Sequence, residues 1–194
     1  MRVEPYSEDT VFESLVLEDD VITDYEFSGC RFEGCDVTRC RFVRCRFTDC
    51  VFSGCRASEL EFKDTILLDC AFQNCHLTGI NWNLLLGGGF LFPLAKLTNC
   101  HLKYNYFTDM NFAGFDFSQN EIFFSLFSDC NLSKAKFRST GLNDTEFFRC
   151  YLTQADFRGA VGYKIDLESN KLKKARFSFP EAMNLLNGLG ILID

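Results

Sequence analysis

The sequence is poor in the side chains from which most catalytic sites are built. Its 194 residues include only two histidines, His76 and His101, and neither has a nucleophile or a carboxylate partner at an indicative spacing. The one glycine run, Gly87–Gly89, is not followed by the Lys-Ser/Thr pair and helix of a phosphate-binding loop. We therefore expect no enzymatic activity, no catalytic residue and no bound cofactor.

Three further absences narrow the classes of partner. No stretch of about 18 uncharged apolar residues occurs, so we expect no membrane-spanning helix. No C-x₂₋₄-C pairs converge, so we expect no metal site. The 20 Lys and Arg residues are outnumbered by 27 Asp and Glu, and the net charge of −7 disfavours direct binding to nucleic acid. The polar, acidic start of the chain predicts a cytoplasmic protein whose cysteines stay reduced.

The sequence does contain a strict five-residue repeat. Stepping by five from Phe12 to Phe177 reaches Phe at 17 of 34 positions and Leu at ten more. All eleven cysteines lie two residues before such a position: Cys30, Cys35, Cys40, Cys45, Cys50, Cys55, Cys70, Cys75, Cys100, Cys130 and Cys150. A period of five fits neither a helix nor a flat strand, and instead predicts a chain that turns a corner after every fifth residue.

Four five-residue sides make a square coil, and stacked coils form a β-solenoid in which residues 20 apart lie above one another. The large residues of the repeat then fill the axis, and the small residues two before them fill the corners. A buried cysteine behaves as a small hydrophobe, so we expect packed free thiols, although stacked cysteines would also be close enough for a disulfide. A core filled in this way leaves no pocket for a substrate.

The repeat resembles that of the pentapeptide-repeat family, whose unit is approximately Ala-(Asp/Asn)-Leu-x-x. The stretch from Ala155 to Gly159, Ala-Asp-Phe-Arg-Gly, matches that unit. The resemblance implies an all-β fold, a right-handed quadrilateral parallel β-helix with a short C-terminal capping helix. We expect a lead-in at residues 1–10, the β-helix at residues 11–178, and a helix with a dimerisation tail at residues 179–194.

The repeat weakens at residues 81–93, NWNLLLGGGFLFP. The count of five continues there, but Gly87 occupies an axial position that a glycine cannot fill. We expect a local distortion of one side of one coil, with residues 84–86 pushed outward. Two interpretations stay open, a tolerated defect and a bulge that contacts a partner. Because the register is otherwise unbroken, no long loop is expected to project between coils.

The C-terminal segment leaves the repeat after Phe177. Pro180 suits the first position of a helix, and the apolar residues that follow predict a short capping helix with a tail-to-tail homodimer beyond it. The segment resembles the ends of quinolone-resistance pentapeptide proteins of the Qnr type and of a pentapeptide immunity protein of albicidin producers, which implies dimerisation through this end. The predicted dimerisation residues are Leu185, Leu186, Leu189, Ile191, Leu192 and Ile193.

Two outward-facing surfaces are candidates for partner binding if residues 20 apart stack throughout. The first is an acidic column made of Asp49, Asp69, Asp109 and Asp129. The second is an apolar patch, although bulky neighbours on a solenoid wall could equally cover one another. Its residues are Leu84, Leu86, Tyr104, Tyr106, Phe123, Phe124 and Leu126. The same stacking rule puts the two histidines in different columns. Six arginines from Arg31 to Arg56 interrupt the negative charge of the surface, so the electrostatic field is expected to be uneven.

Two functions stay open at this stage. The family resemblance, with the acidic column on a rod about as wide as a DNA duplex, implies a DNA mimic. Such a protein would bind DNA gyrase, a type II topoisomerase, and protect it from quinolone- or albicidin-type antibiotics. The alternative is a protein-interaction scaffold with no topoisomerase role, because many functions share one fold.

Overall fold

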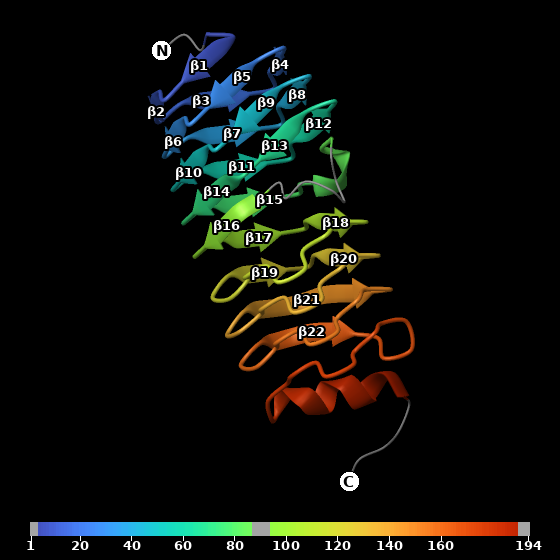
Figure 1. The fold of residues 1–194 in the computed structure, drawn as a ribbon. Coiled ribbons are helices and arrows are strands. Elements are labelled where there is room, and N and C mark those ends of the chain that lie inside the picture. The colour runs from blue at the N-terminus through green and yellow to red at the C-terminus, as the bar shows by residue number, and fades with distance from the viewer. Residues whose placement is uncertain (1–3, 87–93, 190–194) are drawn as a thin grey trace.

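The computed structural model describes residues 4–86 and 94–189, which form a rod of stacked coils (Figure 1). The chain begins at one end of the rod, and a C-terminal helix lies across the other end. All the strand pairs are parallel, as the stacking of successive coils requires. The predicted fold, a parallel β-helix of four-sided coils, is confirmed.

Each coil has four short sides, and the stacked sides form four faces, numbered here by the first strand of each. Face 1 contains β1 (Tyr6–Glu8), β5 (Glu26–Ser28), β9 (Arg46–Thr48) and β13 (Ile66–Leu68). Face 2 contains β2 (Val11–Glu13), β6 (Arg31–Glu33), β10 (Val51–Ser53), β14 (Cys70–Gln73) and β16 (Leu94–Thr98). Strand β1 thus lies inside the segment expected to be a lead-in.

The other two faces continue along the whole rod. Face 3 contains β3 (Val16–Glu18), β7 (Asp36–Thr38), β11 (Arg56–Ser58), β15 (His76–Thr78), β17 (His101–Lys103) and β19 (Glu121–Phe123). Face 4 contains β4 (Val21–Thr23), β8 (Arg41–Val43), β12 (Glu61–Lys63), the 3₁₀ helix η1 (Trp82–Leu84), β18 (Tyr106–Thr108) and β20 (Leu126–Ser128). Strands β21 (Gly141–Phe148) and β22 (Val161–Ile165) turn the corner from face 3 to face 4.

Beyond residue 110, faces 1 and 2 are joined by single bridges instead of full strands. On face 1 the bridges link Asn111, Asn131, Tyr151 and Lys171, and on face 2 they link Asp116, Lys136, Asp156 and Arg176. The chain therefore keeps its four-sided path to the C-terminal end of the rod.

The corners explain one feature of the repeat, a residue with positive φ two positions after most of the axial side chains. Asp9, Asp19 and Asp24 adopt φ values of 47°, 56° and 63°, and glycine fills the same position at Gly29 and Gly34. Asp, Asn and Gly are the residues that tolerate this left-handed conformation best. The backbone N–H at each corner donates to a carbonyl of the next coil, as Asp9 does to Ser28 at 2.9 Å.

One coil is longer than the others, and this overturns the expectation that residues 20 apart stack throughout. On face 3, Arg56 pairs with His76, 20 residues on, but His76 pairs with His101, 25 residues on. Asn81 likewise pairs with Tyr106. The five extra residues equal one side, so the axial phase is kept while every later residue moves around the rod by one face.

The distorted segment itself is described only up to Leu86. Leu84 and Leu86 are exposed as expected, but Leu85 and Trp82 are buried. The prediction that all of residues 84–86 are pushed outward is therefore wrong for Leu85. The glycine run and residues up to 93 lie outside the described residues. The expectation that no long loop projects between coils falls, at this coil, on residues outside the described ones, and the 25-residue step from His76 to His101 shows only that the coil contains five extra residues.

The longest aromatic ladders of the core lie on faces 2 and 4. Phe117, Phe137 and Phe157 stack with ring centroids 4.7–4.8 Å apart on face 2, and Phe107, Phe127 and Phe147 stack at 4.6–5.0 Å on face 4. The two ladders meet edge to face, as Phe137 does with Phe147 at 5.5 Å. Such geometry suits the ring quadrupoles and makes aromatic pairs more favourable than their buried area alone.

All eleven cysteines are buried and free, as predicted. They occupy the corner positions just inside the wall, and their thiols donate to main-chain carbonyls. Cys35 Sγ lies 3.3 Å from the carbonyl oxygen of Phe12, and Cys55 Sγ lies 3.2 Å from that of Phe32. Burial raises the pKa of the Cys30 thiol. These thiols are therefore packing groups with satisfied donors.

The core is not evenly filled, which corrects the expectation that the solenoid leaves no pocket. Axial residues in the C-terminal half, such as Phe117, Ile122 and Leu142, are fully buried. Their counterparts Val37, Phe52 and Ala57 in the N-terminal half are only partly buried. A cavity of about 480 Å³ lies there between the walls.

The C-terminal end is closed by the helix η2 (Glu181–Leu189), wound as a 3₁₀ helix over nine residues. The last coil has no further coil to accept its N–H groups. Ser178 Oγ accepts from the Gly159 N–H at 2.9 Å, and Glu181 Oε1 accepts from the Gly162 N–H at 2.7 Å. Leu185 packs against the core. The predicted capping helix is confirmed, and it protects a sheet edge that would otherwise be open.

The ladders should dominate stability. Phe137→Ala removes a ring that contacts four other phenylalanines, and we expect a loss of about 3–5 kcal/mol. Thermal unfolding followed by circular dichroism should show a fall in Tm on the order of 10 °C. The matched control is Phe179→Ala, because Phe179 is 81% exposed. Equal effects of the two variants would contradict a core built on stacked rings.

Candidate interaction surfaces

The predicted acidic column does not exist as one column. Asp49 and Asp69 stack at the corner between faces 1 and 2, where the Asp49 N–H donates to the Leu68 carbonyl. Asp109 and Asp129 stack at the corner between faces 4 and 1, where the Asp109 N–H donates to the Ser128 carbonyl. The five extra residues of the long coil separate the two pairs by one face, so they cannot present a continuous acidic stripe.

The corner aspartates also have a conformational explanation. All four adopt φ values between 52° and 57°, in the left-handed region that Asp tolerates better than most residues. Their spacing therefore follows from the repeat and is not by itself evidence of a binding site. The charge is moreover partly neutralised, because Arg149 Nη2 lies 2.8 Å from Asp129 Oδ2 and its hydrogen bond lowers the pKa of that carboxyl group.

The arginines of the N-terminal half are mostly paired with acids one coil away. Arg39 binds Asp19 at 2.7 Å, Arg44 binds Asp24 at 2.7 Å, and Arg41 binds Glu61 at 2.6 Å. These groups are more than 40% exposed, and exposed pairs of this kind contribute about 0–1 kcal/mol each. The uneven electrostatic field that these arginines predicted is therefore made of local ion pairs between stacked coils.

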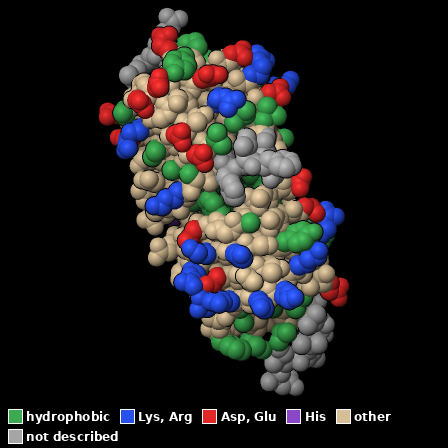
Figure 2. Space-filling view, in the orientation of Figure 1, with side chains coloured by type: hydrophobic (Ala, Val, Ile, Leu, Met, Phe, Trp, Pro, Cys, Tyr) green, Lys and Arg blue, Asp and Glu red, His purple; other side chains and the backbone are tan. Residues whose placement is uncertain are grey.

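Charge is distributed unequally along the rod. The corner between faces 1 and 2 carries Asp9, Asp49 and Asp69 in the N-terminal half, but Lys134 and Lys174 in the C-terminal half. Figure 2 shows Asp and Glu side chains mainly towards the N-terminal end and a band of Lys and Arg across the C-terminal coils. The residues of this basic band on face 2 and its corner are Lys134, Lys136, Arg138, Arg158, Lys174 and Arg176.

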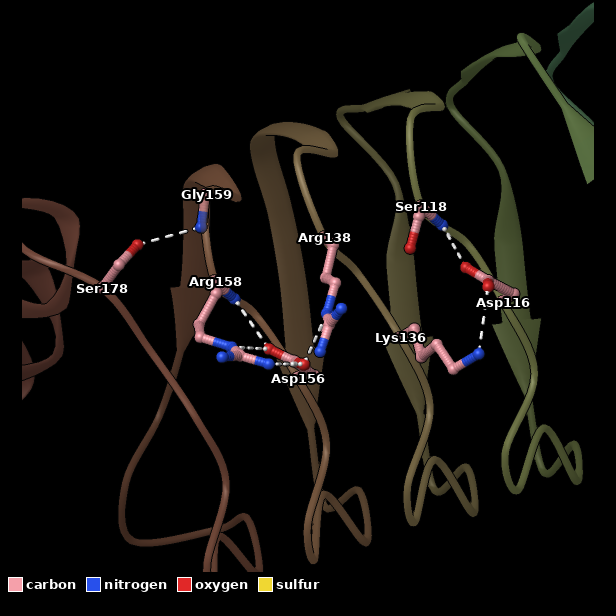
Figure 3. Close-up of polar contacts among 8 residues, drawn as sticks. All are labelled: Asp116, Ser118, Lys136, Arg138, Asp156, Arg158, Gly159 and Ser178. Carbon is pink, nitrogen blue, oxygen red and sulfur yellow. Dashed lines mark hydrogen bonds and ion pairs between the residues drawn. The ribbon is translucent and has the colours of Figure 1, made fainter.

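Asp156 holds two arginines of the basic band in place (Figure 3). Arg158 Nε and Nη2 lie 2.8 Å from its two carboxylate oxygens, and Arg138 Nε lies 2.6 Å from Oδ2. The hydrogen bonds from Arg158, with those from Arg138, keep the pKa of Asp156 well below its ordinary value. A similar ion pair joins the neighbouring coils of face 2, where Lys136 Nζ lies 3.3 Å from Asp116 Oδ2. A bidentate arginine pair of this kind is geometrically specific.

The apolar patch is present in part. Tyr104 and Phe124 stack at the corner between faces 3 and 4 with ring centroids 5.4 Å apart, and Tyr106 pairs with Leu126 on face 4. With Asp144, Glu146 and Lys164 these residues line a hollow of about 410 Å³. Tyr104, Tyr106 and Phe124 are each nearly half exposed. These four residues therefore form an accessible aromatic and aliphatic surface.

The other three predicted residues of the patch, Leu84, Leu86 and Phe123, lie near these four residues but do not stack in the same columns. Leu84 and Leu86 were expected beneath Tyr104 and Tyr106, but the long coil moves them to the next corner and to face 1, where the Leu86 N–H donates to the Thr65 carbonyl. The helix η1, which ends at Leu84, still contacts β18. Phe123 lies on face 3, paired with Lys103.

The structure also brings together the two histidines, which the sequence analysis had assigned to different columns. His76 and His101 stack in parallel on face 3, with ring centroids 4.7 Å apart, so their assignment to different columns is wrong. An insertion equal to one side leaves no trace in the five-residue phase, and no sequence signal could have revealed this pair. Within residues 4–86 and 94–189, no three His, Cys, Asp or Glu residues gather as a metal site would require.

The predicted dimerisation surface is described only in its first part. Leu185 packs inward against the last coil, and Leu186 is partly buried. Leu189 ends η2, and Ile191, Leu192 and Ile193 lie outside the described residues. No helix in the described part of the chain is long and apolar enough to span a membrane.

Two family profiles match the chain. The profile described as "Pentapeptide repeat region" covers residues 25–102, and "Pentapeptide repeats (8 copies)" covers residues 125–161, so together they span more than half of the sequence. No curated protein sequence matches.

Two solved structures align with most of the chain. A trypsin-treated variant of QnrB1, a plasmid-mediated fluoroquinolone resistance protein, is 17% identical and aligns over 99% of this chain and 100% of its own, with a TM-score of 0.54. HetL, a pentapeptide repeat protein involved in heterocyst differentiation regulation from the cyanobacterium Nostoc sp. strain PCC 7120, is 12% identical. It aligns over 87% of this chain and 85% of its own, with a TM-score of 0.48. At these identities the first comparison shows a shared fold.

Asp156 should make stability depend on acidity. Its folded-state pKa lies below the ordinary value of about 3.9, so ionised Asp156 stabilises the fold above that pH and the contribution is lost as pH falls towards the folded pKa. Asp156→Asn should cost about 1–3 kcal/mol at pH 7 and narrow the difference in Tm between pH 7 and pH 3.

The matched control is Asp109→Asn, because Asp109 makes no ion pair within the described residues. Its Tm at pH 7 should stay within about 1–2 °C of the parent. An Asp156→Asn variant with an unchanged pH profile would contradict the role assigned to the two arginines.

Proposed function

Because the chain belongs to the pentapeptide-repeat family, we propose that it is a non-catalytic, protein-binding solenoid that binds DNA gyrase and protects it from gyrase-targeting antibiotics. The fold that it shares with QnrB1, which confers fluoroquinolone resistance, supports this class of role. The observation that carries the proposal is the exposed aromatic surface of Tyr104, Tyr106 and Phe124 next to the one long coil.

This surface has the composition of a protein-binding site. Tyrosine and other aromatic side chains are enriched among the residues that contribute most to interfaces, since they bury a large area at a small entropic cost. The rim of the hollow adds Asp144, Glu146 and Lys164, and a polar rim around an apolar centre is typical of such sites. The backbone beneath belongs to stacked strands, so the surface is held rigidly before binding.

The charge distribution limits the part played by DNA mimicry. A DNA-like ligand would present a continuous negative stripe to the basic groove of gyrase, and the two aspartate pairs lie at different corners. We propose that the contact is made mainly by the aromatic surface, with one aspartate pair at most beside it. The N-terminal half, where most unpaired acids lie, is the end with the greater electrostatic attraction to a basic groove.

A second candidate is a scaffold for partners unrelated to topoisomerases. The basic band around Arg138, Arg158 and Arg176 favours it, because a cationic face is not expected on a mimic of DNA. Under this alternative the aromatic surface and the basic band would each serve a protein partner, and gyrase activity would not respond.

A supercoiling assay separates the two candidates. Excess protein should change the supercoiling of relaxed plasmid by purified gyrase, or restore it in the presence of a quinolone or albicidin. Tyr106→Ala combined with Phe124→Ala should weaken the effect by about tenfold or more, since loss of an interface centre costs about 2 kcal/mol. The matched control is Tyr151→Ala, an equally exposed tyrosine on face 1.

The acidic pairs are tested in the same assay as separate variants. Reversal of Asp49 and Asp69 to Lys, or of Asp109 and Asp129 to Lys, should weaken the effect in at most one case, because the pairs face different directions. No effect of the parent protein on gyrase, with or without drug, would exclude the gyrase proposal and favour the scaffold.

We further propose a homodimer joined through the C-terminal end. The protein should then sediment at twice its mass of 22.3 kDa. Leu186→Asp combined with Leu192→Asp should yield monomers, whereas Leu185 is left intact because it packs against the core. Tyr6→Asp at the opposite end is the control and should leave the mass unchanged. A monomeric parent protein at micromolar concentrations would contradict the proposal.

A further inference from the structure

The N-terminal half of the solenoid encloses an elongated apolar cavity that none of the surfaces above accounts for. Its volume is about 480 Å³, and its walls come from four successive coils, from Leu17 in the first to Leu77 and Trp82 in the fourth. Three steps of about 4.8 Å between coils give it a length of roughly 14 Å along the axis. It is therefore a lumen and not a surface dimple.

The lumen has a definite cause in the sequence of face 3. The axial residues there are Leu17, Val37, Ala57 and Leu77, so the two middle coils carry the smallest side chains of the ladder. Faces 2 and 4 carry phenylalanines at the same levels, and these do not reach far enough to fill the space. The C-terminal half shows the contrast, because Leu102, Ile122 and Leu142 on face 3 are fully buried there.

The chemistry of the walls selects against water and polar ligands. Nearly every lining side chain is aliphatic or aromatic, and the thiols of Cys35 and Cys55 already donate to main-chain carbonyls. An apolar cavity of about 150 Å³ stays dry and binds benzene or xenon, and this lumen is about three times that size. It also falls within the 300–1,000 Å³ typical of ligand pockets.

In the part of the chain that the structure describes, only two charged residues, Asp20 and Arg56, belong to the lining. Asp20 lies in the first coil, beside Val16 and Val21, which are both more than 65% exposed, whereas Arg56 lies two coils further along face 3 and pairs with Asp36. The C-terminal end of the rod is covered by η2, whereas no helix covers the first coil within the described residues. An apolar molecule could thus enter at the N-terminal end and keep a polar group near Asp20, at the mouth of the lumen.

From these observations we propose that the lumen binds the alkyl chain of a small single-chain amphiphile, with the chain along the axis and the head group at the N-terminal end. The elongated shape and apolar lining match an extended hydrocarbon chain. The partial exposure of Val37, Phe52 and Ala57 is surface that these axial residues present to the lumen, where a bound chain would contact them. This site is independent of the proposed contact with gyrase.

Trp82, the one tryptophan of the chain, lines the inner end of the lumen and is 1% exposed. A heavy atom at the tip of a bound chain would quench its fluorescence. Titration of the full-length protein with 12-bromododecanoic acid, below its micelle concentration, should give saturable quenching. Unbrominated dodecanoic acid should bind in competition and reverse the quenching.

Ala57→Leu fills the lumen from face 3, where Val37 and Leu77 flank the position and Leu77 already carries the same side chain. It should raise the Kd for the brominated acid at least tenfold. Because it fills a void, it should also raise Tm without ligand by about 2–4 °C. Val161→Leu, which enlarges an exposed side chain of the same face, is the matched control and should bind like the parent.

Three results would overturn the proposal: no saturable quenching of the parent protein, equal quenching in Ala57→Leu, or quenching that dodecanoic acid does not reverse. A second lumen variant, Val37→Leu, covers the case in which Ala57→Leu fails to fold, and circular dichroism verifies the fold of each. An N-terminal dimer that covers the opening would appear as a doubled mass that persists in the Leu186→Asp, Leu192→Asp variant, without ligand binding, and that result also contradicts the proposal.

Discussion

The hydrogen bonds between successive coils are the constraint on which the rest of this structure depends. Each corner N–H donates to the carbonyl of the neighbouring coil, and the chain must therefore return to the same lateral position after a whole number of sides. That requirement sets the five-residue side and the left-handed corner residue. It also directs one large side chain per side towards the axis. Core, corners and surface columns all follow from this one condition.

The same condition explains which features the sequence could predict. Axial phenylalanines, buried thiols and corner aspartates repeat every five residues, and this periodicity predicted the square coil, whereas Pro180 and the apolar residues after it predicted the capping helix. The pairing of His76 with His101 and the division of the aspartates could not be foreseen, because an insertion of one full side changes the column without changing the phase. The lumen was missed for another reason. Its volume depends on which faces oppose one another across the axis, and Ala57 by itself looks like an ordinary variation of the repeat.

The two halves of the rod have different physical characters. The N-terminal half is acidic, has an incompletely filled axis and carries arginines that pair with stacked acids. The C-terminal half is tightly filled, is closed by η2 and carries the basic band ordered by Asp156. The aromatic surface lies just beyond the long coil that joins them. A partner bound there would lie at the transition between the two halves and could contact both charge signs.

The long coil has a consequence for how such proteins can change over time. Adding or removing one unit of five leaves every side chain facing inward or outward as before, yet turns all downstream surface by a quarter of a revolution relative to the upstream part. A solenoid of this kind can therefore bring distant surface groups into new alignments, as it does for His76 and His101, in a single genetic step that leaves its interior chemistry intact.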